Sequence, residues 1–177
     1  MNIHTPFETK ICIENLSNRK RIWIDLYIHE TYDDVLEEIG VQWPNSCDWE
    51  VVDLEGFDHL SSMHQNNIRQ LCSIGAAIRA MGDPQVVAAY LAGDCCPPWD
   101  KLTELIQSRY VGHFESTGKA YQEYLENYNP EYRSTISAIG IDILDSIDWD
   151  HAALSHFVNV QDEIILTDVN GIFVFDK

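Results

Sequence analysis

Hydrophobic and polar residues alternate in two segments near the start of the chain. The alternation covers Lys10–Leu16 and Arg21–Ile28 and is typical of half-buried strands. In the second segment the residues expected on the buried face are Ile22, Ile24, Leu26 and Ile28. Ser17-Asn18-Arg19 between the two segments predicts a turn, and Trp49–Leu54 is a third strand candidate. The pattern therefore predicts a small antiparallel sheet.

A short acidic helix is expected between the second and third strands. Thr31 followed by Asp34 resembles a capping box, and Gly40 with Pro44 closes the segment. From Ser61 to about Tyr110 the spacing becomes helical, at positions Met63, Ile68, Leu71, Ile74, Ile78 and Met81. Breaks at Gly82-Asp83-Pro84 and Pro97-Pro98 divide this region into three helices, of which the last is Trp99–Tyr110.

The last third of the chain mixes both patterns. Ser116 or Thr117 begins a helix that reaches Tyr128, and Pro130 breaks it. A short helix is expected at Asp150–Val158. Asn170-Gly171 predicts a two-residue type I′ turn, which would join Ile164–Leu166 to Ile172–Val174 as a terminal hairpin.

These elements predict an α+β fold in three subdomains. Residues 1–60 form the sheet with its helix, residues 61–108 a central helical bundle, and residues 109–177 a mixed subdomain ending in the hairpin. Each part is near the lower size limit for an independent core.

Charge is the most unusual property of the composition. The 177 residues include 29 acidic and 11 basic side chains, a net charge of −18, with 45% hydrophobic and 11% aromatic residues. So many apolar residues exclude a disordered acidic tail, and the negative charge excludes nucleic acid as a partner and disfavours anionic membranes. Five cysteines without a secretory framework, and no apolar run long enough to cross a bilayer, predict a soluble protein of the reducing cytoplasm.

The carboxylates are unevenly distributed. Nineteen of them lie in two stretches without lysine or arginine, Ile22–Ile68 and Ser134–Asp176, whereas residues 69–133 contain six basic side chains. Adaptation to high salt is an alternative explanation of the acidity, but it would spread carboxylates over the whole surface. The layout instead favours a functional array.

Catalytic and metal-binding patterns are mostly absent from the sequence. His59 and His64, like His151 and His156, are five residues apart, which does not match the helical zinc motif. Asp142, Asp145 and Asp148 lack the glycine of a calcium loop and fit one helical face better. We therefore predict no cofactor, no metal and no catalysis, while a hydrolase using paired carboxylates remains an alternative.

An acidic surface can act without catalysis by imitating nucleic acid. Duplex DNA has one negative charge per roughly 1.7 Å of its axis, so a dimer carrying twice −18 would match the charge of about 60 Å of duplex. Its carboxylates would pair with the lysine and arginine side chains that normally contact phosphates. Such a protein would block a DNA-binding enzyme by competition.

Several segments of the chain resemble segments of one known protein family. They include Trp23-Ile24-Asp25-Leu26, Asp53-Leu54-Glu55-Gly56-Phe57, Tyr110–Ser116 and Gly171–Phe175. Asp148-Trp149-Asp150 with Ala153 is similar to a further motif of that family. The matches follow the family order over nearly the whole chain, which thereby resembles the ArdA antirestriction proteins of plasmids, transposons and phages. In that family the first segment lies on the second strand, the second ends the first domain, and the further motif is the antirestriction motif.

The resemblance implies an elongated homodimer that imitates bent B-form DNA and binds the methyltransferase and specificity core of type I restriction–modification enzymes. The expected phosphate surrogates are Asp25, Asp33, Asp34, Glu37, Glu38, Asp53, Glu55, Asp58, Asp142, Asp145, Asp148 and Asp150. The dimer is expected to form through the C-terminal part, with Trp149, Ala153 and Phe157 as candidate interface residues, for which core packing is the alternative. A different DNA-binding protein or defence effector remains an alternative target.

Overall fold

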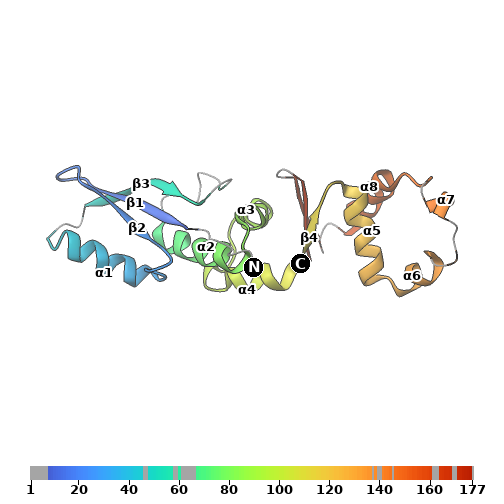
Figure 1. The fold of residues 1–177 in the computed structure, drawn as a ribbon, viewed down its shortest axis with the longest axis horizontal. Helices are drawn as coiled ribbons and strands as arrows, with labels where there is room; N and C mark the ends of the chain where they lie inside the picture. The colour runs from blue at the N-terminus through green and yellow to red at the C-terminus, as the bar shows by residue number, and fades with distance from the viewer. Residues whose placement is uncertain are drawn as a thin grey trace, which may run out of the picture. The chain divides into compact units, whose positions relative to one another are not determined.

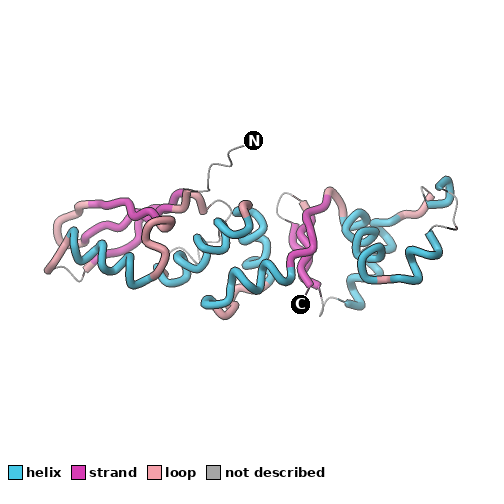
Figure 2. Tube along the Cα trace, turned by 60° about the horizontal axis from the view of Figure 1, so that its bottom comes forward, coloured by secondary structure: helices cyan, strands magenta, loops and turns pink. Residues whose placement is uncertain are grey.

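The computed structural model has an α+β fold, which confirms the predicted class. It describes residues 8–45, 48–57, 60, 67–136, 138, 141–144, 146–160, 164–168 and 171–176. Contacts divide the chain into unit 1, Met1–Ser108, and unit 2, Arg109–Lys177, each with a three-stranded antiparallel sheet (Figures 1 and 2). The finer division into three subdomains stays a prediction.

The sheet of unit 1 has the order β2-β1-β3. Its strands are β1 (Lys10–Asn15), β2 (Arg21–Asp25) and β3 (Trp49–Glu55). β2 is shorter than predicted because the Asp25 side chain accepts a hydrogen bond from the Tyr27 backbone at 2.8 Å, which starts a turn. The expected burial of Ile28 is therefore wrong, since its side chain is 70% exposed.

Helix α1 (Tyr32–Gln42) begins with the predicted capping box. The Thr31 hydroxyl accepts from the Asp34 backbone at 3.2 Å, and the Asp34 carboxylate accepts from the Thr31 backbone at 2.9 Å. Val35 and Ile39 are buried on the inner face of the helix. The opposite face is left to the carboxylates.

Helices α2 (Ile68–Met81), α3 (Pro84–Gly93) and α4 (Leu102–Arg109), with the short helix η2 (Trp99–Lys101), complete unit 1. Asp83 and Pro84 start α3 as predicted. α2 and α1 lie on the same side of the sheet (Figures 1 and 2). The contact is close: a Cβ at Gly75 would lie 3.4 Å from Leu26 Cδ1, and Arg79 donates to the Leu26 carbonyl at 2.8 Å. Sheet and helices therefore share one core.

The sheet of unit 2 has the order β4-β6-β5. The elements of this unit are β4 (Tyr110–Phe114), α5 (Thr117–Tyr128), α6 (Pro130–Ile136), α7 (Ile141–Leu144), α8 (Trp149–Val160), β5 (Ile164–Asp168) and β6 (Ile172–Asp176). The prediction that the preceding helix continues to Tyr110 is wrong, because Tyr110 already pairs with Phe175 of β6. A partner so distant in sequence leaves no local signal for β4.

The terminal hairpin is confirmed, but its turn is not the predicted one. β5 and β6 pair with Asp168 opposite Ile172, so three residues separate the paired positions rather than two. Gly171 has φ 142°, a value outside a type I′ turn. Asn170 lies outside the described residues. Strand β6 contributes three fully buried residues to unit 2: Phe173, Val174 and Phe175.

No helix within the described residues is long and apolar enough to cross a membrane.

Candidate functional site

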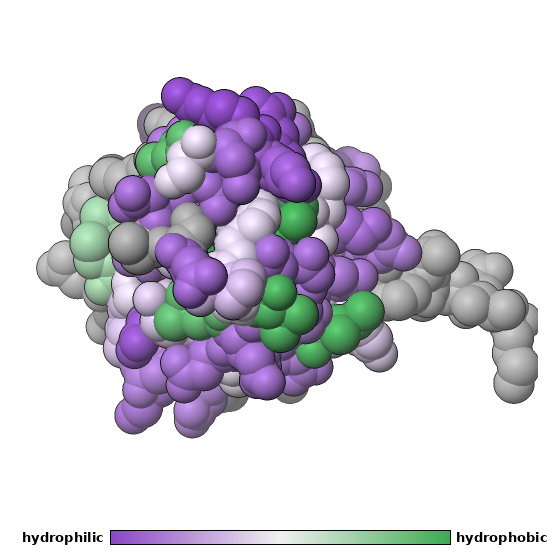
Figure 3. Space-filling view, turned by 90° about the vertical axis from the view of Figure 1, so that its left-hand side faces the viewer, coloured by the Kyte–Doolittle hydropathy of each residue, from purple (hydrophilic) through white to green (hydrophobic). Residues whose placement is uncertain are grey.

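Helix α1 presents the most uniformly acidic surface among the described residues. Its sequence has four carboxylates and no basic residue. Asp33 and Glu37 are exposed one turn apart, while Asp34 and Glu38 are partly buried. Like charges at this spacing repel by about 0.2–0.5 kcal/mol per pair, a cost that the buried face of the helix offsets. The face of unit 1 in Figure 3 is correspondingly hydrophilic, with separate hydrophobic side chains.

Asp34 differs from the other three carboxylates because it has a structural partner. Its Oδ2 accepts hydrogen bonds from the backbone and the hydroxyl of Thr31, at 2.9 and 2.7 Å. These bonds hold the pKa of Asp34 below its usual range. Asp34 therefore caps α1, and a replacement there would disturb the helix as well as the charge.

The outer face of the sheet, opposite α2, mixes acids with cations. Three cross-strand rows have a β1 residue in the middle: Asp25–Lys10–Glu55, Trp23–Cys12–Asp53 and Arg21–Glu14–Glu50. The Glu8 carboxylate raises the pKa of Lys10, and Glu55 and Asp25 add to this shift. The stretch 22–68 contains no basic residue, but the fold places Lys10 and Arg21 next to its acids. Eight of its eleven acids lie on this outer face or on α1.

Glu14 is the most buried carboxylate among the described residues. Only 5% of the residue is exposed, and its two oxygens accept from Arg19 Nη1 and Arg21 Nε, both at 2.7 Å. These hydrogen bonds lower the pKa of Glu14. The pair of arginines therefore closes the β1–β2 hairpin around a satisfied charge.

The arginines of α2 contact tyrosines rather than the carboxylates of α1. The guanidinium of Arg69 lies 4.9 Å from the centre of the Tyr32 ring, and that of Arg79 lies 5.9 Å from the Tyr27 ring. The ion pairs of Glu8 and Glu14 do not involve α1. The carboxylates of α1 therefore form no ion pair with a described side chain.

In unit 2 the segment that resembles the antirestriction motif organises helix α8. Asp148 precedes the helix and accepts from the His151 backbone at 3.0 Å. Trp149 packs between Tyr121 and Tyr132 and donates from Nε1 to the Leu144 carbonyl at 3.2 Å. Asp142 belongs to α7, so the expectation that it shares a helical face with Asp148 is wrong.

Asp150 joins α8 to the start of α5. Its Oδ1 accepts from the Gly118 backbone at 2.6 Å, while Ser116 accepts from the Lys119 backbone at 3.3 Å. Two side chains thus satisfy free N–H groups at the N-terminus of α5, where a negative charge is favourable. An aspartate near a helix start is a capping signal, but Asp150 caps a different helix, α5, and a local pattern does not indicate that contact.

The predicted surrogates that the structure describes are all at least partly exposed. Asp33, Glu37, Asp53, Glu55, Asp148 and Asp150 are exposed, and Asp25, Asp34 and Glu38 are intermediate. Asp58, Asp145 and the side chains of Asp142 and Phe157 lie outside the described part of the chain. Ala153 is fully buried against Ala120 and Val174 of its own chain, so the core-packing alternative holds for it. A dimer interface at Trp149 stays a prediction.

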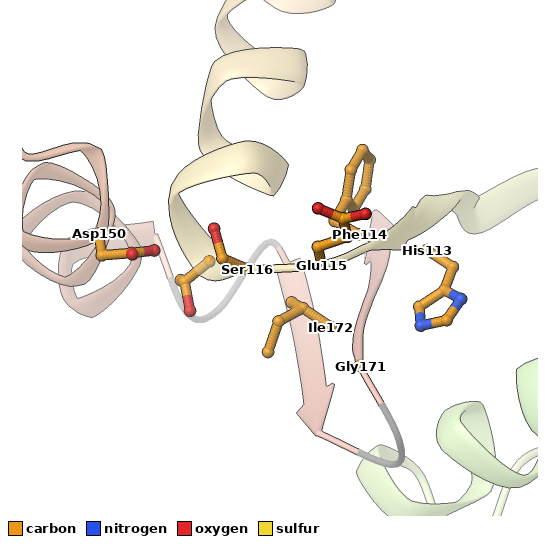
Figure 4. A pocket seen from close by; sticks show the side chains of 8 residues that line it. His113, Phe114, Glu115, Ser116, Asp150, Gly171 and Ile172 are labelled. Atoms are coloured by element: carbon orange, nitrogen blue, oxygen red, sulfur yellow. The ribbon is translucent and has the colours of Figure 1, made fainter. Parts of the chain in front are cut away.

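A pocket of about 730 Å³ in unit 2 collects His113, Ser116 and Asp150, residue types used in hydrolases (Figure 4). The His113 ring points away from the other two and stacks on Phe173, with 4.1 Å between the ring centres. Ser116 and Asp150 already accept backbone hydrogen bonds. The geometry brings no nucleophile and base together.

We expect Asp150→Ala to lower the free energy of unfolding by about 1–2 kcal/mol, because it removes the acceptor for the Gly118 N–H. Asp150→Asn keeps an acceptor oxygen and is expected to cost less. Urea titration of both variants measures the difference. Asp176→Asn, an exposed replacement on β6, is the matched control for loss of one charge. Equal losses for Ala and Asn at position 150 would contradict the capping role.

Comparison of the chain with protein-family models, curated proteins and solved structures found no match. Within the described residues, no three histidine, cysteine, aspartate or glutamate side chains come together as a metal site. The candidate functional site is therefore the acidic surface of α1.

Proposed function

We propose that the protein inhibits a DNA-binding enzyme by presenting carboxylates to the groups that normally contact DNA phosphates. The observation that carries the proposal is α1, which has four carboxylates, no basic residue and no ion pair to a described side chain within 4.0 Å. Lysine and arginine side chains of a partner can approach these carboxylates without displacing a described cation of the protein itself. The inhibitor makes and breaks no covalent bond.

The charge of each unit supports the same proposal. Unit 1 contains 17 acidic and 7 basic residues, a net charge of −10, and unit 2 contains 12 and 4, a net charge of −8. Both units therefore attract a basic surface, and their fields speed diffusional encounter with it. The acids of β3 add to α1 from the other side of the sheet, partly offset by Lys10, Arg19 and Arg21.

The proposed target is the DNA-binding core of a type I restriction–modification enzyme, because the chain resembles the ArdA proteins in several segments. Such an enzyme contacts many phosphates through lysine and arginine. A protein bound in its channel would exclude the DNA substrate by competition, and this is the proposed antirestriction activity. A homodimer would present two copies of each acidic surface.

The salt dependence of binding to the purified type I enzyme tests this mechanism. We expect the affinity to fall at least about tenfold between 50 and 200 mM NaCl, since exposed charge pairs are screened and bound ions are displaced. Duplex DNA measured in parallel supplies the reference slope. Inhibition that does not change with salt, or turnover of a substrate by the protein, would exclude the proposed mechanism.

The identity of the target requires a second measurement. The tagged protein is incubated with extracts from cells that carry or lack a type I system, and the bound subunits are identified. Recovery of the methyltransferase and specificity subunits supports the proposed target. Recovery of another DNA-binding protein instead, with the same salt dependence, would retain the mechanism and change the target.

A further inference from the structure

A pocket of about 410 Å³ lies within unit 1, between the start of α1, one face of α2 and the turn from η2 into α4. Its volume is within the range of about 300–1,000 Å³ typical of ligand sites. Trp99 and Asp100 line it, although no motif in the sequence indicates a site there. The residues meet here only because η2 packs against α2.

Two of the residues that line the pocket are buried, and we call them its floor. They are Cys72, which is 5% exposed, and Leu102, which is 1% exposed, and Leu102 is apolar. Burial raises the pKa of the Cys72 thiol to about 11, so the thiol is neutral at neutral pH. This floor suits the aliphatic part of a long side chain.

Two aromatic side chains, Tyr32 and Trp99, form walls of the pocket. The Tyr32 ring already contacts a guanidinium, that of Arg69, at 4.9 Å from the ring centre. Aromatic faces attract cations by about 0.5–1 kcal/mol at exposed sites, and tryptophan does so most strongly. The indole of Trp99 lines the same pocket.

Two exposed carboxylates, Glu30 and Asp100, also line the pocket. Neither makes an ion pair with a described side chain within 4.0 Å. Arg69 is the single cation among the residues that line the pocket, so the pocket has one negative charge in excess. A cationic ligand with an apolar stem is complementary to this arrangement, whereas an anion would meet two carboxylates.

We propose that this pocket binds an arginine side chain of the protein's partner. The planar guanidinium stacks on an indole and donates two parallel hydrogen bonds to a carboxylate, and it is less strongly hydrated than the ammonium of lysine. The proposal rests on the proposed function for the source of that arginine, a DNA-binding enzyme. The pocket adds a specific anchor to the diffuse attraction of α1.

Binding of N-acetyl-arginine amide to the full chain tests the pocket directly. The indole N–H resonance of Trp99, assigned with the variant Trp99→Phe, is followed by NMR during the titration. We expect a saturable shift with the arginine probe and a weaker one with N-acetyl-lysine amide. The citrulline analogue has nearly the same shape but no charge, and it should give no saturable shift.

A pair of double variants separates the pocket from general charge. Glu30→Gln with Asp100→Asn is expected to weaken binding of the arginine probe about tenfold. Asp33→Asn with Glu37→Gln removes the same charge from α1 outside the pocket and is expected to change the affinity less than about twofold. Backbone amide spectra confirm that both variants are folded.

Three results would overturn the proposal: no saturable shift with arginine, an equal shift with citrulline, or equal losses in the two double variants. Because the probe is a small molecule, such a failure leaves salt-dependent inhibition by α1 unaffected. Conversely, salt-independent inhibition would contradict the proposed function without changing the probe result. The two proposals therefore fail separately.

Discussion

Replacing Asp33, Glu37, Glu38 and Glu50 together with their neutral amides is expected to weaken binding to the type I enzyme about 100-fold. Each of these carboxylates is free of a described ion pair and available to a partner. Asp33, Glu37 and Glu50 are exposed and Glu38 is partly buried. Four surface charge pairs at roughly 0.5–0.8 kcal/mol each amount to about 2–3 kcal/mol, or about two orders of magnitude in affinity. Equilibrium binding at fixed salt measures the change.

The matched control removes four exposed carboxylates from residues 69–133, the segment that contains six basic side chains. These are Glu104, Glu115, Glu123 and Glu131, each replaced by glutamine. The net charge changes equally, so the control is expected to lose only about three- to tenfold through the general field. Equal losses in the two variants would show that net charge alone decides, and that the layout of the acids has no specific role.

The first variant is also expected to be as stable as the natural chain, or slightly more stable. Asp33 and Glu37 repel each other at one helical turn, and their neutralisation relieves about 0.2–0.5 kcal/mol. Asp34 is left unchanged because it caps the helix. Weaker binding together with unchanged or higher stability would identify these carboxylates as functional rather than structural.

The second large effect is expected at Phe173. Phe173→Ala should lower the free energy of unfolding of unit 2 by about 3–5 kcal/mol, because loss of the fully buried ring leaves a cavity against the face of β6, the central strand of the sheet. The His113 ring would also lose its stacking partner. Since native domains are stable by about 5–15 kcal/mol, this is a large fraction of the total.

Urea unfolding followed by NMR signals from both units measures this effect. Phe173→Leu, which keeps much of the volume, is the matched control and should cost about 1–1.5 kcal/mol. Signals of unit 1 are expected to change little, because the contacts of the chain cluster in two separate units. A loss below about 1 kcal/mol for Phe173→Ala would contradict the packing around β6.

The acids of unit 2 illustrate that a carboxylate can have two roles. Asp148 and Asp150 are exposed enough to add to the field, yet each accepts a backbone hydrogen bond at a helix start. Loss of function in a variant at these positions therefore needs a stability measurement beside it. The asparagine replacement separates the two roles because it keeps the acceptor and removes the charge.

Features of the fold that depend on near neighbours in the chain could be predicted from the sequence. The capping box of Thr31 and Asp34, the start of α3 at Asp83 and the terminal hairpin were predicted because a few adjacent residues specify each of them. The net charge and the α+β class also follow from composition and periodicity. These signals reach only a few residues along the chain.

Contacts between residues far apart in the chain could be seen only in the folded protein. β4 exists as a strand because it pairs with β6, about sixty residues later. The register of β1 places Lys10 between Asp25 and Glu55. The stretch Ile22–Ile68, which contains no basic residue, therefore has a lysine next to two of its acids. The pocket of Tyr32 and Trp99 likewise depends on helix packing. Such contacts are fixed by the burial of whole faces, a long-range property that no short pattern encodes.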